Sequence, residues 1–150
     1  MIKMSVKKRG FTMIELLVVI AILGLLATVG LVSFRTAQIK GRDAQRKNDL
    51  AQIQKALEMY YNDYGLYPTD EYSSSGSFID TKGTLYMKEV PQDPKFGSYL
   101  YSSDGTFYLL YARLENTQDS CFDSGLCKDY GVDCGGENCN YAVASPNRIP

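Results

Sequence analysis

The sequence predicts an α+β protein in which a long N-terminal α-helix packs on a small antiparallel β-sheet, followed by a disulfide-bonded C-terminal loop. An uncharged apolar run at residues 16–34 continues into residues 35–64, which have the apolar spacing of an amphipathic helix. Two Tyr-rich runs flank an Asp-Gly step within residues 98–113, which is a strong hairpin signal. All four cysteines lie within residues 121–139, where few apolar residues are available to form a core.

The composition argues against an enzyme and against a nucleic-acid-binding protein. The chain has 150 residues and no histidine, which removes the commonest general base and metal ligand. Its formal net charge is −1, but residues 1–10 carry four of the 16 basic residues and no acid. The rest of the chain therefore has a formal net charge of −5, whereas a nucleic-acid-binding protein needs a basic face. An enzyme that uses cysteine-bound zinc or an activated thiol is the weakest of the alternatives.

The N-terminal apolar run is long enough to cross a membrane. Residues 16–34 read LLVVIAILGLLATVGLVSF, and as a helix they span roughly 28 Å, about the thickness of a bilayer's hydrocarbon core. Lys and Arg residues precede the run, so the positive-inside rule predicts a cytoplasmic N-terminus with the rest of the chain outside. A cleaved secretory signal is the alternative, but its apolar core is shorter, and here the helical pattern continues beyond the run.

The residues around this run resemble the class III signal sequence of type IV pilins and type II secretion pseudopilins. Basic residues come first, then Gly10-Phe11-Thr12, then Glu15 at the head of an apolar run that contains Gly24. The resemblance implies that a prepilin peptidase cuts between Gly10 and Phe11 on the cytoplasmic side, and that the new N-terminus of Phe11 is methylated. The apolar segment stays in the product, and the implied fold is the type IV pilin fold.

This interpretation divides the chain into four segments. They are a cleaved cytoplasmic leader at residues 1–10, a transmembrane and assembly helix at 11–34, the amphipathic half of the helix at 35–64, and an extracytoplasmic β head with a cysteine-rich tail at 65–150.

Glu15 is a carboxylate at the edge of hydrocarbon, where an unpaired charge costs on the order of several kcal/mol. In the family that the sequence resembles, this acid neutralises the terminal amine of a neighbouring subunit, here that of Phe11, as helices stack into a filament. The alternative is a solvated acid at headgroup level without a role in assembly. Many family members also carry a proline later in the run, where the helix melts during assembly. This chain has none there, so Gly30 is the expected place of any melting.

Residues 35–64 extend the helix beyond the apolar run. Apolar side chains recur at steps of three and four, which places them on one helix face: Leu50, Ile53, Leu57, Tyr60 and Tyr64. Gly65 and Pro68 supply the stop signals. A single helix from about residue 11 to about residue 63 suits a subunit whose first half packs on its own copies and whose second half packs under a sheet.

The head is predicted from its turn residues and its Tyr-rich runs. Residues 65–83 form an exposed connecting loop, with Phe78 and Ile79 tucked onto the sheet. The stretch EVPQDP at 89–94 resembles the entry to the sheet in the major pseudopilin. Residues 98–102 and 107–113 form the strands of a hairpin. Most of the tyrosines are expected in core and cross-strand packing rather than in a binding surface.

The four cysteines allow three disulfide pairings. Their spacing departs from the paired C-x2-C pattern of zinc sites, and the compartment predicted for this part of the chain is oxidising. Pairing in sequence order, Cys121–Cys127 and Cys134–Cys139, is favoured because the intervening loops are short and flexible. The nested pairing, Cys121–Cys139 with Cys127–Cys134, stays open.

The tail is also acidic, and carboxylates with backbone carbonyls are the ligands that Ca²⁺ prefers. Because major pseudopilins bind calcium in their C-terminal loop, the resemblance makes calcium a candidate cofactor. The candidate ligands are Asp123, Asp129, Asp133 and Glu137. Their spacing fits no EF-hand, so a solvated acidic loop without a cofactor is the preferred interpretation.

The expected function is that of a structural subunit in a type IV pilus-like filament. The single-pass precursor would reside among inner-membrane lipid, be cut by prepilin peptidase, and be extracted by an assembly ATPase and a platform protein. It would then polymerise with its own copies into a cell-surface or periplasmic filament. The alternative within the family is the major pseudopilin of a type II secretion system, which EVPQDP favours, whereas the cysteine-rich tail favours a surface fibre. A third alternative is a monomeric, membrane-anchored extracellular binding module.

Overall fold

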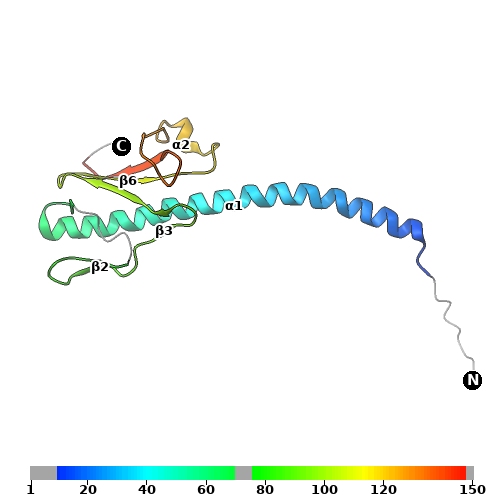
Figure 1. Cartoon of the computed structure of the whole chain (residues 1–150), viewed down its shortest axis with the longest axis horizontal. Helices are drawn as coiled ribbons and strands as arrows, with labels where there is room; N and C mark the ends of the chain where they lie inside the picture. The colour runs from blue at the N-terminus through cyan, green and yellow to red at the C-terminus, as the bar shows by residue number, and fades with distance from the viewer. Residues whose placement is uncertain (1–9, 70–75, 148–150) are drawn as a thin grey trace, which may run out of the picture. The chain divides into compact units, whose positions relative to one another are not determined.

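The computed structural model describes residues 10–69 and 76–147 (Figure 1). It comprises two compact units, residues 1–38 and residues 39–150, here termed the N-terminal unit and the C-terminal unit. The long helix α1 (Met13–Tyr64) contributes its first half to one unit and its second half to the other. All the strands and the short helix α2 (Ser120–Asp123) belong to the C-terminal unit.

The helix α1 is uninterrupted over 52 residues, which confirms the prediction of one long helix. It runs through Gly24 and Gly30 without a break. Melting at Gly30 concerns the assembling chain, and it stays a prediction. The helix ends at Gly65, whose backbone has a φ of +70° and whose N–H donates to the carbonyl of Tyr61 at 2.7 Å. Gly adopts this left-handed conformation at little cost, which is why it terminates helices so often.

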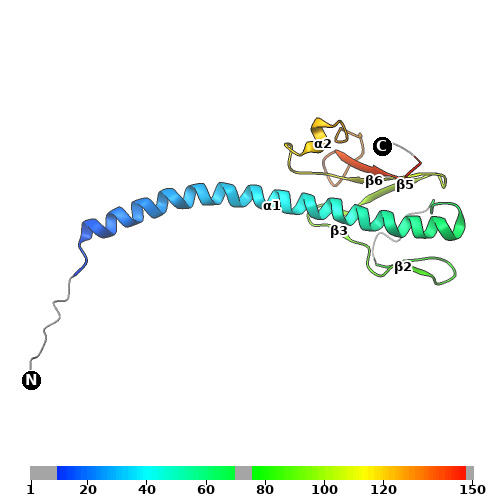
Figure 2. The same cartoon turned by 180° about the vertical axis from the view of Figure 1, so that it is seen from behind.

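The strands form three separate antiparallel sheets rather than one. Two are minimal pairs, β1 (Phe78–Ile79) with β2 (Leu85–Met87) and β3 (Gln92–Asp93) with β4 (Gly97–Ser98). The third has the order β5-β6-β7, made of β5 (Leu100–Ser103), β6 (Tyr108–Ala112) and β7 (Tyr141–Ala144). Both views place the C-terminal half of α1 between the β5-β6-β7 sheet and the β1-β2 pair (Figures 1 and 2).

The predicted hairpin is present as β5-β6, with shorter strands than expected. Residue 98 belongs instead to β4, because Gly97, with a φ of +88°, turns the chain back against β3. The connecting loop expected at 65–83 is partly a strand, since Phe78 is buried and pairs with β2. The remainder of that prediction at residues 70–75 lies outside the described residues.

The core of the C-terminal unit joins α1 to the central strand β6. The fully buried side chains Leu50, Ile53 and Leu57 of α1 pack with Tyr108 and Leu110 of β6 in one hydrophobic cluster. Burial alternates along β6, as expected for a strand with one face on the core. Burying each aliphatic side chain contributes about 1.5–3 kcal/mol. The predicted packing role of the helix face, and of several tyrosines, is therefore confirmed.

Candidate functional site

The predicted cleavage step lies just before α1. Gly10 and Phe11 are both exposed and precede the first helical residue, Met13. Phe11 is 83% exposed. Cleavage between Gly10 and Phe11 and methylation of Phe11 both stay predictions. The backbone at this step is exposed and non-helical, so a peptidase can reach it.

Glu15 and Thr12 cap the N-terminus of α1. The backbone N–H and the hydroxyl of Thr12 both donate to Glu15 Oε2, at 2.8 and 2.6 Å, and Glu15 N donates to Thr12 Oγ1 at 3.3 Å. This reciprocal arrangement is a capping box, and it satisfies N–H groups that have no partner within the helix. A carboxylate in the first turn also interacts favourably with the helix dipole. The spacing T-x-x-E was present in the sequence as a signal, but Thr12 was not assigned this role from it.

Behind this cap, α1 presents a continuous apolar surface. An 18-residue window of the helix has a mean hydropathy of 2.8 and none of it is buried, so by length and composition it can cross a membrane. The hydroxyls of Thr28 and Ser33 donate to carbonyls one turn earlier, Leu25 O at 2.8 Å and Val29 O at 3.2 Å. These hydrogen bonds offset the free-energy cost of burying the two hydroxyl groups within a membrane or a helix bundle.

The C-terminal unit contains a buried ion cluster centred on Arg46 of α1. Arg46 is 0% exposed, and it donates to both carboxylate oxygens of Asp93, at 2.6 and 3.1 Å. It also donates to Asp43 Oδ1 at 2.7 Å and to Glu115 Oε1 at 2.9 Å. Burial alone would lower the pKa of Arg46, but its hydrogen bonds to Asp93, Glu115 and Asp43 raise that pKa above its ordinary value.

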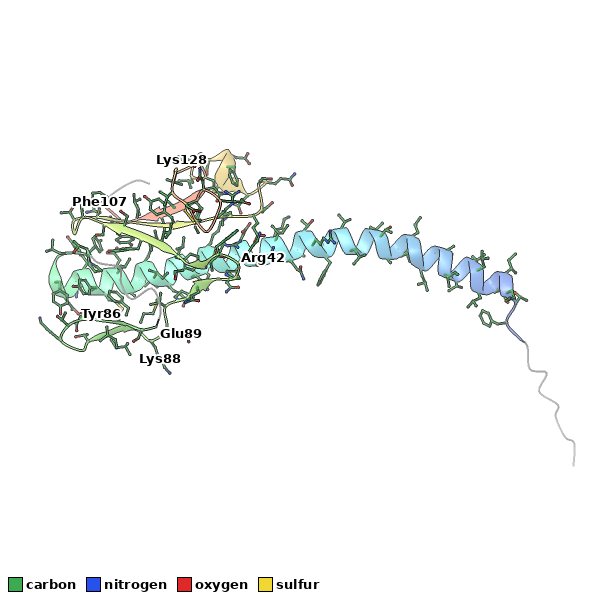
Figure 3. All side chains as sticks on the ribbon, viewed as in Figure 1. Arg42, Tyr86, Lys88, Glu89, Phe107 and Lys128 are labelled. Carbon is green, nitrogen blue, oxygen red and sulfur yellow. A yellow bond between two sulfur atoms is a disulfide. The ribbon has the colours of Figure 1, made fainter. Side chains whose placement is uncertain are left out.

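Two further cations stabilise Glu115 at the edge of this cluster. Arg42, labelled in Figure 3, binds both carboxylate oxygens at 2.7 and 2.8 Å, and Lys95 reaches Oε2 at 3.4 Å. The hydrogen bonds from Arg42 lead the causes that lower the pKa of Glu115 to about 2. Asp43 also accepts from the backbone N–H groups of Glu115 and Asn116, at 2.9 and 2.7 Å. The cluster thereby fastens β3 and the segment after β6 to α1.

The cysteine-rich tail is cross-linked between sequence neighbours. The disulfides are Cys121–Cys127 and Cys134–Cys139, which is the pairing favoured from loop length, and the nested pairing is not formed. Lys47 of α1 holds the start of α2 through both carboxylate oxygens of Asp119, each at 2.7 Å. The hydrogen bond from Lys47 is the largest cause that lowers the pKa of Asp119.

The four calcium candidates are engaged separately. Asp123 is exposed on α2, and Asp129 accepts from Gly131 N at 2.8 Å and from Asn138 Nδ2 at 3.0 Å. Asp133 accepts from the backbone of residues 135–136, and Glu137 forms an ion pair with Arg113. Within residues 10–69 and 76–147, no three His, Cys, Asp or Glu side chains converge on a point that could hold a metal ion. The arrangement does not fit a calcium site, so a solvated acidic loop without a cofactor stays the prediction and calcium binding stays the alternative to it.

Comparisons with known proteins point to one family. Residues 6–31 match the family described as "Prokaryotic N-terminal methylation motif", and residues 34–111 match "Type II secretion system (T2SS), protein G". The chain is 31% identical over 109 residues to the type II secretion system core protein G of Vibrio cholerae, covering 66% of this chain and 73% of that protein. The Escherichia coli K12 protein of the same name is 30% identical over 139 residues, covering 81% and 94% of the two chains. No solved structure gives a significant match.

Proposed function

Because the chain belongs to the type II secretion system protein G family, we propose that it is the major structural subunit of a secretion pseudopilus. The relatives are named as core proteins of a type II secretion system, and residues 6–31 of this chain match the N-terminal methylation motif, which supports a processed structural subunit. The observation that carries the proposal is the exposed apolar surface of α1 directly behind a capped Glu15 and the Gly10–Phe11 step. Such a surface requires lipid or other copies of the same helix to cover it.

The geometry of the cap suggests how one carboxylate serves both the monomer and the filament. Both hydrogen bonds from Thr12 reach Oε2 of Glu15. A carboxylate has acceptor positions on both oxygens, so Oε1 can receive the terminal ammonium group of Phe11 from a neighbouring copy while the cap persists. Pairing the two charges offsets the desolvation that each suffers as helices pack together. Glu15 is thus positioned by Thr12 before the neighbour arrives.

The same features support a proposed order of membrane storage, processing and assembly. The precursor is anchored in the inner membrane by the apolar half of α1, and the peptidase removes residues 1–10 on the cytoplasmic side. A cytoplasmic ATPase and a membrane platform protein supply the work of extraction, because moving the apolar helix out of lipid is unfavourable until it packs on other copies. The C-terminal units then decorate a periplasmic filament.

Between the two filament interpretations, the family match favours the secretion pseudopilus over a surface pilus. The match to protein G spans residues 34–111, which includes EVPQDP at 89–94 and the hairpin β5-β6. The disulfide-bonded tail, which favoured a long-lived surface fibre, lies beyond that matched region.

Substitution of Glu15 tests the proposal. In cells that assemble the secretion system, we expect Glu15→Gln to be cleaved and held in the membrane, with at least a tenfold loss from the sheared filament fraction. Asp123→Asn, which removes an exposed acid from α2, is the matched control and should assemble as the unsubstituted chain does. Equal amounts of Glu15→Gln and control in filaments would refute the assembly role.

A further inference from the structure

A polar cavity of about 660 Å³ opens on the side of α1 that faces the segment between β2 and β3. Gln45, Asp49 and Gln52 line it from α1, Glu89 lines it from the facing segment, and Gln92 lines it from the start of β3. Glu89 is exposed although it lines the cavity, and it is labelled in Figure 3. The lining therefore offers carboxylates and side-chain amides, whose oxygens accept hydrogen bonds.

Among the residues that the structure describes, the carboxylate of Asp49 has no cationic partner. Its residue is only 6% exposed, and the hydroxyl of Tyr99 donates to Oδ2 at 2.8 Å. Burial is the largest cause that raises the pKa of Asp49 above its ordinary value. Among the described residues, no Lys or Arg nitrogen lies within ion-pair distance of it. Burial makes a charged carboxylate unfavourable, and here only neutral groups donate hydrogen bonds to it. A cation that reached this carboxylate would therefore stabilise its charged form.

In the nearby ion cluster, every cation is paired with a carboxylate of that cluster and none of them contacts Asp49. The cluster holds three carboxylates and three cations, and each cation is already paired there: Asp43, Asp93 and Glu115 with Arg42, Arg46 and Lys95. The residues that line the cavity include no Lys or Arg in the part of the chain that the structure describes. Residues 70–75, which precede the cavity-lining Gly76, also contain neither in the sequence.

The chain itself carries cations that match this cavity. In the described part of the C-terminal unit, all arginines form ion pairs, whereas several exposed lysines form none: Lys40, Lys55, Lys82, Lys88 and Lys128. A lysine ammonium is a compact donor of three hydrogen bonds on a flexible stem, which suits insertion into a cavity lined by oxygen acceptors. In a homopolymer, every such lysine is presented to neighbouring copies at high local concentration.

We propose that this cavity receives the ammonium group of a lysine from a neighbouring copy of the chain, as a second subunit contact outside the apolar helix. The proposal rests on the proposed function, since it requires the chains to assemble. It gives the C-terminal units a polar, salt-sensitive contact, which would fix the register of neighbours more than it strengthens the filament.

Zero-length cross-linking tests the contact. A carbodiimide joins a carboxylate to an ammonium group as an amide, with loss of water, only when the two are already in contact. Sheared filaments are treated, denatured and separated by size, and the peptides of the covalent dimer are sequenced by mass spectrometry. We expect a link from Asp49 or Glu89 to a lysine peptide in the dimer fraction. The intrachain pair Lys47–Asp119, at 2.7 Å, is the internal positive control.

Two variants assign the link to the cavity. Asp49→Asn keeps an acceptor for Tyr99 and removes the charge, and Glu89→Gln removes the charge of the exposed lining residue. We expect the yield of the cross-linked peptide in the dimer fraction to fall at least tenfold in the double variant. In Asp123→Asn, that yield should be unchanged. Unsubstituted filaments that give the Lys47–Asp119 link but no dimer link from Asp49 or Glu89 would overturn the proposal.

A cavity link confined to the monomer fraction would also overturn the proposal, because a lysine of the same chain would then occupy the site. The unsubstituted filaments decide the question even if the double variant fails to assemble. Failure of the unsubstituted chain to form filaments at all would instead refute the proposed function.

Discussion

Replacing Arg46 with methionine tests whether the buried ion cluster holds the C-terminal unit together. Arg46 is 0% exposed and makes hydrogen bonds to three carboxylates, of which Asp43 and Asp93 are themselves buried. Arg46→Met keeps much of the side-chain volume but leaves those two carboxylates without their cation. Removing one partner from a buried ion pair costs about 3–5 kcal/mol, a large share of the roughly 5–15 kcal/mol that stabilises a typical domain.

Urea unfolding of the detergent-solubilised chain measures this loss. The chain has 12 tyrosines and no tryptophan, so near-ultraviolet circular dichroism reports tyrosine packing in the C-terminal unit. Arg46→Lys is the matched control, since it keeps the charge but cannot form the paired hydrogen bonds to Asp93, and it should lose less than Arg46→Met. A loss below about 1 kcal/mol for Arg46→Met, typical of exposed pairs, would refute the reasoning.

The same cluster predicts that the free energy of unfolding decreases in acid. The pKa of Glu115 falls from its ordinary 4.5 to about 2 in the folded chain, chiefly through Arg42, so its contribution is present above pH 4.5 and disappears as the pH falls towards 2. A shift of this size corresponds to on the order of 3 kcal/mol. We expect Glu115→Gln to flatten the dependence of unfolding free energy on pH between 4.5 and 2. An unchanged slope in that variant would contradict the assignment.

Three further predictions concern processing and the tail. Gly10→Val should block leader removal, so that the uncleaved precursor accumulates in the membrane and gels show one larger species; normal cleavage would exclude this site. Replacing Cys121 and Cys127 together with serine should lower the unfolding free energy by about 2 kcal/mol, because the disulfide closes a short loop, and urea midpoints with no change would disprove it. Millimolar Ca²⁺ and Mg²⁺ should give equal urea midpoints, whereas a calcium-specific increase abolished by Asp129→Asn or Asp133→Asn would establish a calcium site.

Features written in short sequence patterns could be predicted. The long helix followed from apolar spacing, because Leu50, Ile53 and Leu57 repeat with the helical period and meet one partner surface. The hairpin β5-β6 followed from Asp104-Gly105, since turn chemistry is local. Both features depend on residues only a few positions apart, so they can be predicted from a single sequence without knowing which distant segments meet.

The Arg46 cluster could not be predicted because its partners are distant in the chain. Asp93 and Glu115 lie 47 and 69 residues from Arg46, and a charged residue on a helix usually indicates a solvated face. Its burial follows from how β3 and the segment after β6 return to α1. The separate β3-β4 pair was missed for a related reason, since two-residue strands are set by tertiary packing rather than by propensity.

The mass of the subunit in sheared filaments, measured without reducing agent, tests the central claim most directly. The account predicts a chain that begins at Phe11, carries one added methyl group and lacks four hydrogens because of the two disulfides. A chain that retains Met1 in the membrane and is absent from sheared filaments would contradict it, and would favour a membrane-anchored binding module instead.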